Sequence, residues 1–382
     1  MPACIDAREK EAGLCKKDCS PNGCVLEMRR VLVFGAWLVF VAVLLQLAGW
    51  AYISIGNPKS IEGYGYPTGL FVSHPQLGYL YRAGFSGLFN GAGYREIPIE
   101  INSQGFRDEP FENTPADRAR IAFLGDSVVF GAGVRAEDRF TECLEAPNSA
   151  AKAPSRPPMI LNLGVSSYTF EHYLRLAGLD FFGLEPSAVV VGLTLNDFAA
   201  MESSGPARRL RRHAEGLHTP DWLARIKERI AGTYALRFLS ELGIRLHYTL
   251  MNADKREEYH TKWMRTVVGA WEHPEIQARF RADLDSFVAL AKTAEVPFGF
   301  VVFPELNDVL DPNGFSGPRR TVLRLLHPRN AKVCDPYEDF ARQPDPKQLF
   351  LDHDSVHYSP AGHRLVCAAV RRCLADWGFL SP

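Results

Sequence analysis

The sequence predicts an α/β protein in which helices cover both faces of a parallel sheet, preceded by one long apolar helix. Five short apolar runs alternate with helix-like stretches in the later two thirds of the chain, and these are 120–124, 158–163, 187–193, 296–303 and 331–334. Short apolar strands that alternate with helices are typical of a parallel sheet buried on both sides. The second observation is a charge-free apolar run from Val31 to Ile55.

Composition limits the classes of protein that fit. The chain has 382 residues, of which 46% are hydrophobic and 23% charged, with a formal net charge of -1. This is ordinary globular composition, and the length allows one large α/β domain with additions. A general nucleic-acid-binding protein usually has an excess of lysine and arginine over acidic residues, so we expect no nucleic-acid partner. No motif predicts a cofactor.

The N-terminal segment carries half of the cysteines. Four of the eight precede the apolar run, namely Cys4, Cys15, Cys19 and Cys24. Their spacing does not form two C-x2-C pairs and no histidine lies among them, so the pattern favours a tail that merely contains cysteines over a zinc site. Met28 followed by two arginines is an alternative start of translation, because it opens a more typical membrane signal.

The apolar run 31–55 is long enough to cross a bilayer, which needs about 20 residues. Lys16, Lys17, Arg29 and Arg30 precede it, and Lys59 is the nearest base after it. The positive-inside rule therefore keeps residues 1–30 in the cytoplasm and exports the rest. We expect a retained signal anchor in the cell membrane, because the run exceeds the roughly 7–15 apolar residues of a cleaved signal peptide.

Three further segments complete the predicted organisation. Residues 56–118 are rich in glycine, proline and aromatics and predict a small β-rich lead-in, which we expect to pack on the main domain. The main domain covers 119–382. Within it, 199–285 interrupts the strand pattern after the third strand and predicts a helical cap insertion. Its arginines form either a solvated helix face or a contact for anionic lipid or acidic glycan, and these are Arg208, Arg209, Arg211 and Arg212.

The first candidate catalytic residue is Ser127. Gly125, Asp126 and Ser127 directly follow the first predicted strand. A strand-to-helix turn exposes the hydroxyl and aims backbone N–H groups at the space beside it, which suits a nucleophile. An ordinary turn with a helix cap gives the same short motif, so the motif alone does not decide.

The candidate general base is His357, in a loop before the last predicted helix. An imidazole titrates near neutrality and can accept the proton of a serine. Asp354, three residues earlier, can reach around a turn and hold the ring in one tautomer. His353, His363 and Asp352 lie nearby and compete for these roles. The acidic and histidine residues in this stretch are better spaced for a triad than for a metal, so no metal site is predicted.

Two residues are candidate hydrogen-bond donors to an oxyanion. Gly164 ends the second predicted strand, and Asn196 follows the third. A glycine N–H can approach a ligand with no side chain in the way, and an asparagine amide donates a hydrogen bond without adding charge. With the N–H of Ser127 they predict an oxyanion hole of three donors. Ligands of parallel sheets bind beyond the carboxyl ends of the strands, where all these residues fall.

Taken in order, these groups resemble the four sequence blocks of the SGNH hydrolases, also called the GDSL family. The blocks are Gly125-Asp126-Ser127, Gly164, Asn196-Asp197 and Asp354-Ser355-Val356-His357, and the resemblance covers about residues 119–377. The first block continues with valine where leucine is common, which removes no reacting atom. The segments HPQLGY at 74–79 and INSQGFRDEP at 101–110 resemble the lead-in of membrane-anchored bacterial members, often linked to cell-surface polysaccharides.

The resemblance implies a flavodoxin-like three-layer sandwich with a five-stranded parallel sheet. It implies Ser127 as nucleophile and first oxyanion donor, Gly164 and Asn196 as the other donors, His357 as base and Asp354 as its orienting group. The first and last helices tend to lie side by side in this fold, so a Cys143–Cys367 disulfide is one expectation. A Cys334–Cys373 disulfide is equally allowed, and free buried thiols remain the alternative.

Three functions fit this pattern. The first is hydrolysis of acyl esters of an envelope lipid or cell-surface glycan outside the cytoplasm. The second is transfer of the acyl group from the same serine to an exported polysaccharide. The third is a catalytically inert glycan-binding subunit. The sequence favours hydrolysis because no block is missing.

Overall fold

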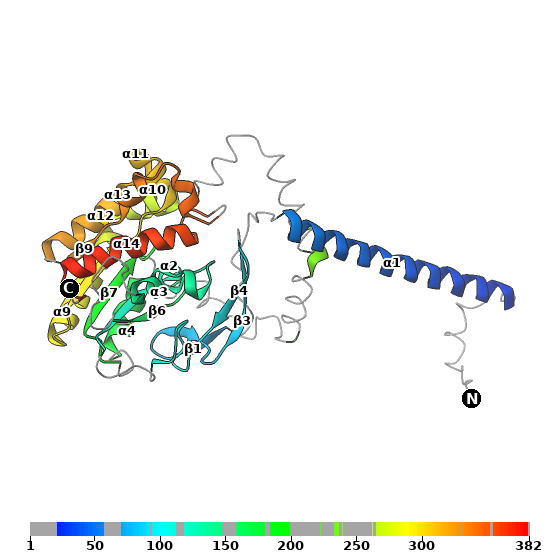
Figure 1. The fold of residues 1–382 in the computed structure, drawn as a ribbon, viewed down its shortest axis with the longest axis horizontal. Helices are drawn as coiled ribbons and strands as arrows, with labels where there is room; N and C mark the ends of the chain where they lie inside the picture. Colours follow the sequence, from blue (N-terminus) through cyan, green and yellow to red (C-terminus); the bar gives the residue numbers. More distant parts are fainter. Residues whose placement is uncertain are drawn as a thin grey trace, which may run out of the picture. The chain divides into compact units, whose positions relative to one another are not determined.

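The computed structural model describes residues 21–56, 70–91, 94–111, 118–146, 158–179, 184–198, 222, 233–236, 239, 262, 265–329, 331–351 and 354–380. The chain forms two compact units. The first contains residues 1–57 and 230–240, and the second contains 58–229 and 241–382. Figure 1 draws the described elements with the labels that are used below.

The first unit is built on the helix α1, Pro21–Gly56. Its segment Arg29–Ala51 is long and apolar enough to cross a membrane, although a signal sequence would meet the same criterion. The polar side chain of Gln46 interrupts this segment and accepts a hydrogen bond at 3.0 Å from the backbone N–H of Ala235. Beside it, a Cβ atom on Gly49 would lie 2.3 Å from the carbonyl oxygen of Tyr234, so only glycine allows this approach.

The second unit contains the predicted five-stranded parallel sheet, in the order β6-β5-β7-β8-β9. The strands are β5 Arg120–Gly125, β6 Met159–Gly164, β7 Ala188–Leu193, β8 Phe298–Val302 and β9 Lys332–Cys334. All five apolar runs that predicted strands are confirmed. This strand order is that of flavodoxin-like folds, so the predicted fold class is confirmed as well.

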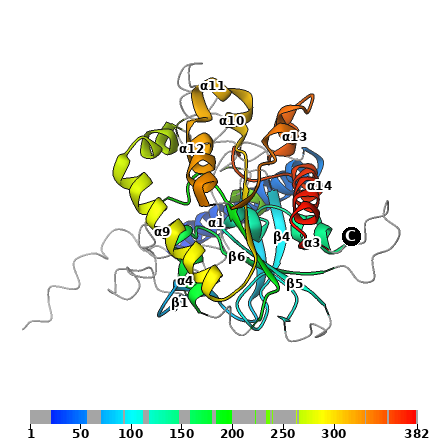
Figure 2. The same ribbon diagram turned by 90° about the vertical axis from the view of Figure 1, so that its left-hand side faces the viewer.

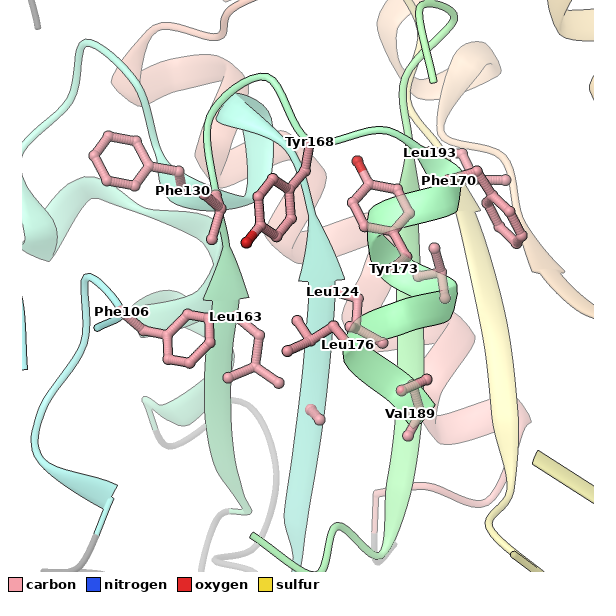
Figure 3. Packing of buried hydrophobic residues seen from close by; sticks show 14 of the residues in the cluster. Phe106, Leu124, Phe130, Leu163, Tyr168, Phe170, Tyr173, Leu176, Val189 and Leu193 are labelled. Carbon is pink, nitrogen blue, oxygen red and sulfur yellow. The ribbon is translucent and has the colours of Figure 1, made fainter. Parts of the chain in front are cut away.

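Alternate residues of each strand face the two helical layers, as the period of a strand requires. In β5, Ala122 and Leu124 pack in the cluster with helices α4 Phe170–Gly178 and α9 Pro274–Thr293. Ile121 and Phe123 pack in the cluster with α3 Phe140–Glu145 and α14 Pro360–Asp376. Figure 2 shows these two helix pairs on opposite sides of the sheet, and Figure 3 shows side chains of α4 against the strands.

The lead-in forms two antiparallel hairpins in the second unit. Their strands are β1 Phe71–His74 with β2 Gly78–Tyr81, and β3 Ser86–Gly91 with β4 Tyr94–Glu100. Buried side chains of the hairpins join the same apolar cluster as α4, for example Tyr79 and Phe89. The lead-in therefore packs on the main domain, as its aromatic content predicted.

The remaining elements connect the strands and helices, and Val322, Leu325 and Leu326 among them pack in the cluster of α4 and α9. These elements are α2 Ser127–Phe130, η2 Ala136–Asp138, α10 Leu306–Leu310, α11 Pro312–Phe315, α12 Gly317–Leu326, η5 His327–Arg329, α13 Tyr337–Ala341 and η6 Pro346–Leu349. Several segments that the sequence analysis named lie outside the described residues. They are the tail 1–20, residues 57–69, most of the predicted insertion with its arginines, and Asp352 and His353. Helix α9 begins at Pro274, so residues 274–285 belong to the helix that covers the sheet.

Both cysteine pairs that the sequence allowed form disulfides, and both end on α14. Cys143 of α3 is bonded to Cys367, and Cys334 of β9 is bonded to Cys373. Helix α14 follows directly after the loop that carries His357. Two covalent bonds therefore fix this helix to the rest of the sandwich.

We expect the two disulfides to stabilise the fold unequally, because they close loops of very different length. Their sequence separations are 224 and 39 residues. The chain-entropy relation then gives the Cys143–Cys367 bond about 1.5 kcal/mol more stabilisation than the Cys334–Cys373 bond. Urea unfolding of the two serine double variants of the full chain in detergent measures this difference. An equal loss, or a larger loss for Cys334→Ser/Cys373→Ser, would contradict the expectation.

Candidate active site

Ser127 is the first residue of α2, at the carboxyl end of β5. The preceding Asp126 is the helix N-cap, and its Oδ1 accepts the N–H of Val128 at 2.9 Å. The first N–H groups of a helix have no partner within the helix, so the cap satisfies that of Val128 and the helix offers no acceptor to the N–H of Ser127. The helix ends at Gly131, whose φ of 76° lies in the left-handed region.

The structure brings Ser127, His357 and Asp354 together in one hydrogen-bonded chain. His357 Nε2 lies 2.7 Å from Ser127 Oγ, and His357 Nδ1 lies 2.9 Å from Asp354 Oδ2. Asp354 Oδ1 accepts the backbone N–H groups of Val356 and His357 at 2.8 and 3.0 Å. These bonds close a tight turn, which is why a carboxylate only three residues away can reach the ring.

The surroundings of His357 favour its charged form. Burial by itself lowers the pKa of the imidazole, but the charge and hydrogen bond of Asp354, together with Asp126, outweigh burial and raise it above 6.5. A base that gains affinity for a proton in this setting can accept one from the hydroxyl it contacts. His357 is buried, with an exposed fraction of 6%.

His363, a competitor for the role of base, lies elsewhere in a structural role. Its Nδ1 accepts the backbone N–H of Phe140 at 3.3 Å, and its ring stacks on the Phe140 ring. Burial, then the charges of Arg139 and Arg107, lowers its pKa to about 3. His363 therefore stays neutral and joins α14 to α3.

Asn196 is held at the end of β7 by a buried polar network. Its Oδ1 lies 2.5 Å from Thr194 Oγ1, which orients the amide so that Nδ2 is turned away from the threonine. Thr194 Oγ1 also lies 2.9 Å from Asp126 Oδ2, and Asp197 Oδ2 accepts the Thr194 N–H at 2.9 Å. Burial raises the pKa of both Asp126 and Asp197. The network joins the loop of the candidate nucleophile to the loop of Asn196.

Gly164 ends β6 against α2, where a Cβ atom would lie 2.3 Å from the backbone nitrogen of Phe130. The N–H of Gly164 is donated to Asn162 Oδ1 at 3.0 Å. Asn162 Nδ2 in turn donates to the carbonyl of Val129 at 2.8 Å. The close approach explains the glycine without a catalytic role, and its N–H is engaged in this structure. Ser167, farther along the same loop, has a φ of 64°.

One acidic group at this edge was missed in the sequence. Glu305 follows β8, is 1% exposed, and neither of its carboxyl oxygens has a well-formed hydrogen bond to another residue that the structure describes. Burial, then the charges of Asp308, Asp126 and Asp354, raises its pKa to about 8. The signal that could have found it is position, because every polar residue after a strand of this sheet lies at the same edge.

No family model and no curated protein sequence matches the chain. Among solved structures it is similar to a lipase/acylhydrolase from Enterococcus faecalis, with 13% identity, a TM-score of 0.39, and coverage of 69% of this chain and 98% of that one. It is also similar to a GDSL-like lipase from Bacteroides thetaiotaomicron, with 12% identity, a TM-score of 0.38, and coverage of 69% and 91%.

A third similar structure is a catalytic mutant of an acetylxylan esterase from Geobacillus stearothermophilus. The identity is 17%, the TM-score is 0.37, and the coverage is 68% of this chain and 95% of that one.

We expect Glu305 to make stability fall as the pH rises. Its pKa in the fold is about 8, against an ordinary value of 4.5. Because the fold binds this proton more tightly than the unfolded chain does, Glu305 contributes its full stabilisation of the fold below pH 4.5. This contribution to the free energy of unfolding is lost as the pH rises through 8. Melting temperatures of the full chain in detergent between pH 5 and 9 should fall less steeply in Glu305→Gln than in the wild type.

The matched control is Glu272→Gln, since Glu272 is exposed. Its pH profile should follow the wild type. Parallel profiles for the wild type and Glu305→Gln would show that Glu305 does not titrate in this range.

Proposed function

We propose that the chain is a serine esterase that hydrolyses carboxylic esters, with Ser127 as nucleophile, His357 as general base and Asp354 as the residue that orients it. The observation that carries this proposal is the continuous chain of hydrogen bonds from Asp354 through His357 to Ser127, at 2.9 and 2.7 Å. A nucleophile in contact with a base, which is oriented by a third group, is the arrangement that activates a hydroxyl.

In the first half of the reaction, Ser127 Oγ attacks the ester carbonyl while His357 Nε2 accepts its proton. The imidazolium is stabilised by Asp354, in agreement with the raised pKa of His357. The ester C–O bond then breaks, and the leaving alkoxide takes the proton from His357. The product of this step is an acyl group on Ser127.

In the second half, His357 accepts a proton from water while the water oxygen attacks the acyl carbonyl. The bond from that carbon to Ser127 Oγ breaks, and the proton returns to the serine. A sugar hydroxyl in place of water would give acyl transfer by the same steps. The two outcomes differ in the acceptor alone, so an assay must follow both free acid and acylated acceptor.

The negative oxygen of both tetrahedral intermediates needs hydrogen-bond donors. We assign this role to the N–H of Ser127, at the first turn of α2, and to Nδ2 of Asn196, whose Oδ1 is held by Thr194. Gly164 remains a predicted third donor, and its N–H would have to leave Asn162 Oδ1 to serve. The side chains that tie these loops together keep the donors in place before the charge develops.

We further propose that the catalytic unit lies outside the cytoplasm, anchored to the cell membrane by α1, with acyl esters of an envelope lipid or glycan as substrates. The two disulfides support an oxidising compartment, since such bonds persist in secreted and periplasmic proteins and are rare in the cytosol. The lysines and arginines before the apolar run 31–55 support the same orientation.

Replacing Ser127 with alanine should abolish hydrolysis of short aryl esters by the full chain in detergent, because the variant lacks the hydroxyl that contacts His357 and would carry the acyl group. The release of the coloured phenol measures the reaction, with and without a sugar acceptor. Ser286→Ala is the matched control, since this exposed serine donates its hydroxyl to the carbonyl of Ala282 within its own helix α9. Hydrolysis that survives in Ser127→Ala would contradict the assignment.

Replacing Asn196 with alanine should lower kcat while the enzyme still binds ester. Loss of one oxyanion donor costs roughly 2.7–4 kcal/mol, or about 10²–10³-fold in kcat. Steady-state kinetics with the same aryl ester measure the change. Asn196→Asp tests the same point, since a carboxylate at this position repels the oxyanion. An unchanged kcat in both variants would remove Asn196 from the site.

A further inference from the structure

The lead-in contains a turn that reaches the elements that carry the candidate triad. The turn spans Ile101 to Asp108 in the sequence INSQGFRD. Asn102 Oδ1 accepts the N–H groups of Gln104 and Phe106 at 3.0 and 2.9 Å. Gly105 has a φ of 88°, which few other residues adopt. These features fix the conformation of the turn, and with it the direction of Arg107 and Asp108 at its end.

Arg107 enters the loop that follows the candidate nucleophile. Its guanidinium donates to the carbonyls of Gly131 at 2.7 Å, Val134 at 2.9 Å and Phe130 at 3.3 Å. A further hydrogen bond, at 3.0 Å, goes to the carbonyl of Pro98 in β4. The side chain is 2% exposed. A buried arginine whose partners are backbone carbonyls fixes the path of a chain, because its planar donors select one arrangement of acceptors.

This matters because α2 is only four residues long, Ser127–Phe130. A single turn has few internal hydrogen bonds, so its position depends on contacts at its ends. The N-cap Asp126 fixes the end that carries Ser127. Arg107 binds the carbonyls of Phe130 and Gly131 at the other end, and its guanidinium lies 5.0 Å from the Phe130 ring.

Two neighbours of Arg107 in the lead-in hold the adjacent strand and loop. Asp108 Oδ2 accepts the backbone N–H of Asn162 in the edge strand β6 at 2.8 Å. Tyr81 OH donates to Ser166 Oγ at 2.9 Å and accepts the N–H of Ser166 at 2.7 Å. Figure 3 shows Phe106 of the turn close to Leu163 of this strand. The lead-in thus covers an otherwise open sheet edge at the side where Ser127 lies.

We propose that Arg107 is a positioning residue for Ser127, and that the lead-in holds α2 and the loop after β6 in their reactive arrangement. The proposal rests on the esterase function proposed above. Arg107 touches no reacting atom and acts through the backbone of residues 130–134. Misplacement of a reacting group by about 1 Å can cost about 100-fold in rate, so loss of these bonds acts on the chemical step.

The test compares Arg107→Met and Arg107→Lys with the wild type as full chains in detergent. Methionine fills similar volume without donors, and lysine restores the charge with a single ammonium group. We expect kcat of Arg107→Met for an aryl ester to fall by about 10- to 100-fold with KM changed by less than about threefold. Arg107→Lys should recover part of the loss.

The matched control is Arg118→Met. Arg118 donates to the carbonyl of Pro158, before the first residue of β6 and thus at the opposite end of the sheet from Ser127. Its kcat should stay within about twofold of the wild type, because the change lies far from the reacting atoms. An equal loss of kcat in the two methionine variants, or a loss confined to KM, would overturn the proposal.

Amide hydrogen exchange provides a readout that does not depend on any substrate. Peptides covering 127–134 should exchange faster in Arg107→Met than in Arg118→Met. Unchanged exchange there overturns the positioning role even if the wild type proves inactive. The wild type could show no hydrolysis while exchange at 127–134 rises in Arg107→Met as expected. The proposed esterase function would then be wrong, whereas the role of Arg107 in holding residues 127–134 would be supported.

If Arg107→Met does not fold, Tyr81→Phe takes its place, since it removes both hydrogen bonds to Ser166 and keeps the ring that packs on Phe130. We expect a fall in kcat of about tenfold together with faster exchange in the loop at 165–169. Wild-type kcat and exchange in Tyr81→Phe would overturn the proposal.

Discussion

The hydrogen bond between Ser127 Oγ and His357 Nε2 joins residues that are 230 positions apart in the chain. This contact exists only because all five strands run in the same direction and end at the same edge of the sheet. Ser127 begins the helix after β5, and His357 lies in the loop before the last helix. Any change that tilts one of these elements lengthens the bond that the proposed chemistry requires.

Several parts of the fold can be understood as supports for that contact. Helix α14 follows the loop that carries the base His357, and two disulfides connect this helix to α3 and β9. Asp126 caps α2 on the side of the serine and is linked through Thr194 to the loop of Asn196. Arg107 supports the far end of α2. These contacts come from four regions of the chain, so the site depends on the whole second unit.

Several acids are buried at the carboxyl ends of the strands, and their burial raises their pKa values. Asp126, Asp197 and Glu305 are all nearly inaccessible, and burial raises the pKa of each. Asp354 differs because it accepts two backbone N–H groups and faces the imidazole. Hydrogen bonds to a carboxylate and an adjacent cation favour the charged form. Among these four acids, Asp354 is the one whose carboxylate contacts the His357 imidazole, at 2.9 Å.

The sequence by itself determined the strands and the order of the polar groups after them. The apolar runs, with glycine or polar residues at their ends, predicted β5 to β9 and placed Ser127, Asn196, Asp354 and His357 at one edge. Burial on both faces makes such strands readable from local composition. The sequence also allowed both cysteine pairs that form disulfides, but it left free thiols as an alternative.

Only the tertiary structure decided which neighbours each side chain meets. It separated His357 from His363, engaged the N–H of Gly164 with Asn162, and buried Glu305 beside three other acids. It also brought Arg107 from the lead-in to the carbonyls after Ser127. Such contacts join residues that are distant in the chain, and the local pattern of hydrophobicity carries no information about them. The physical reason is that periodicity reports which face of an element is buried, whereas packing decides what lies against it.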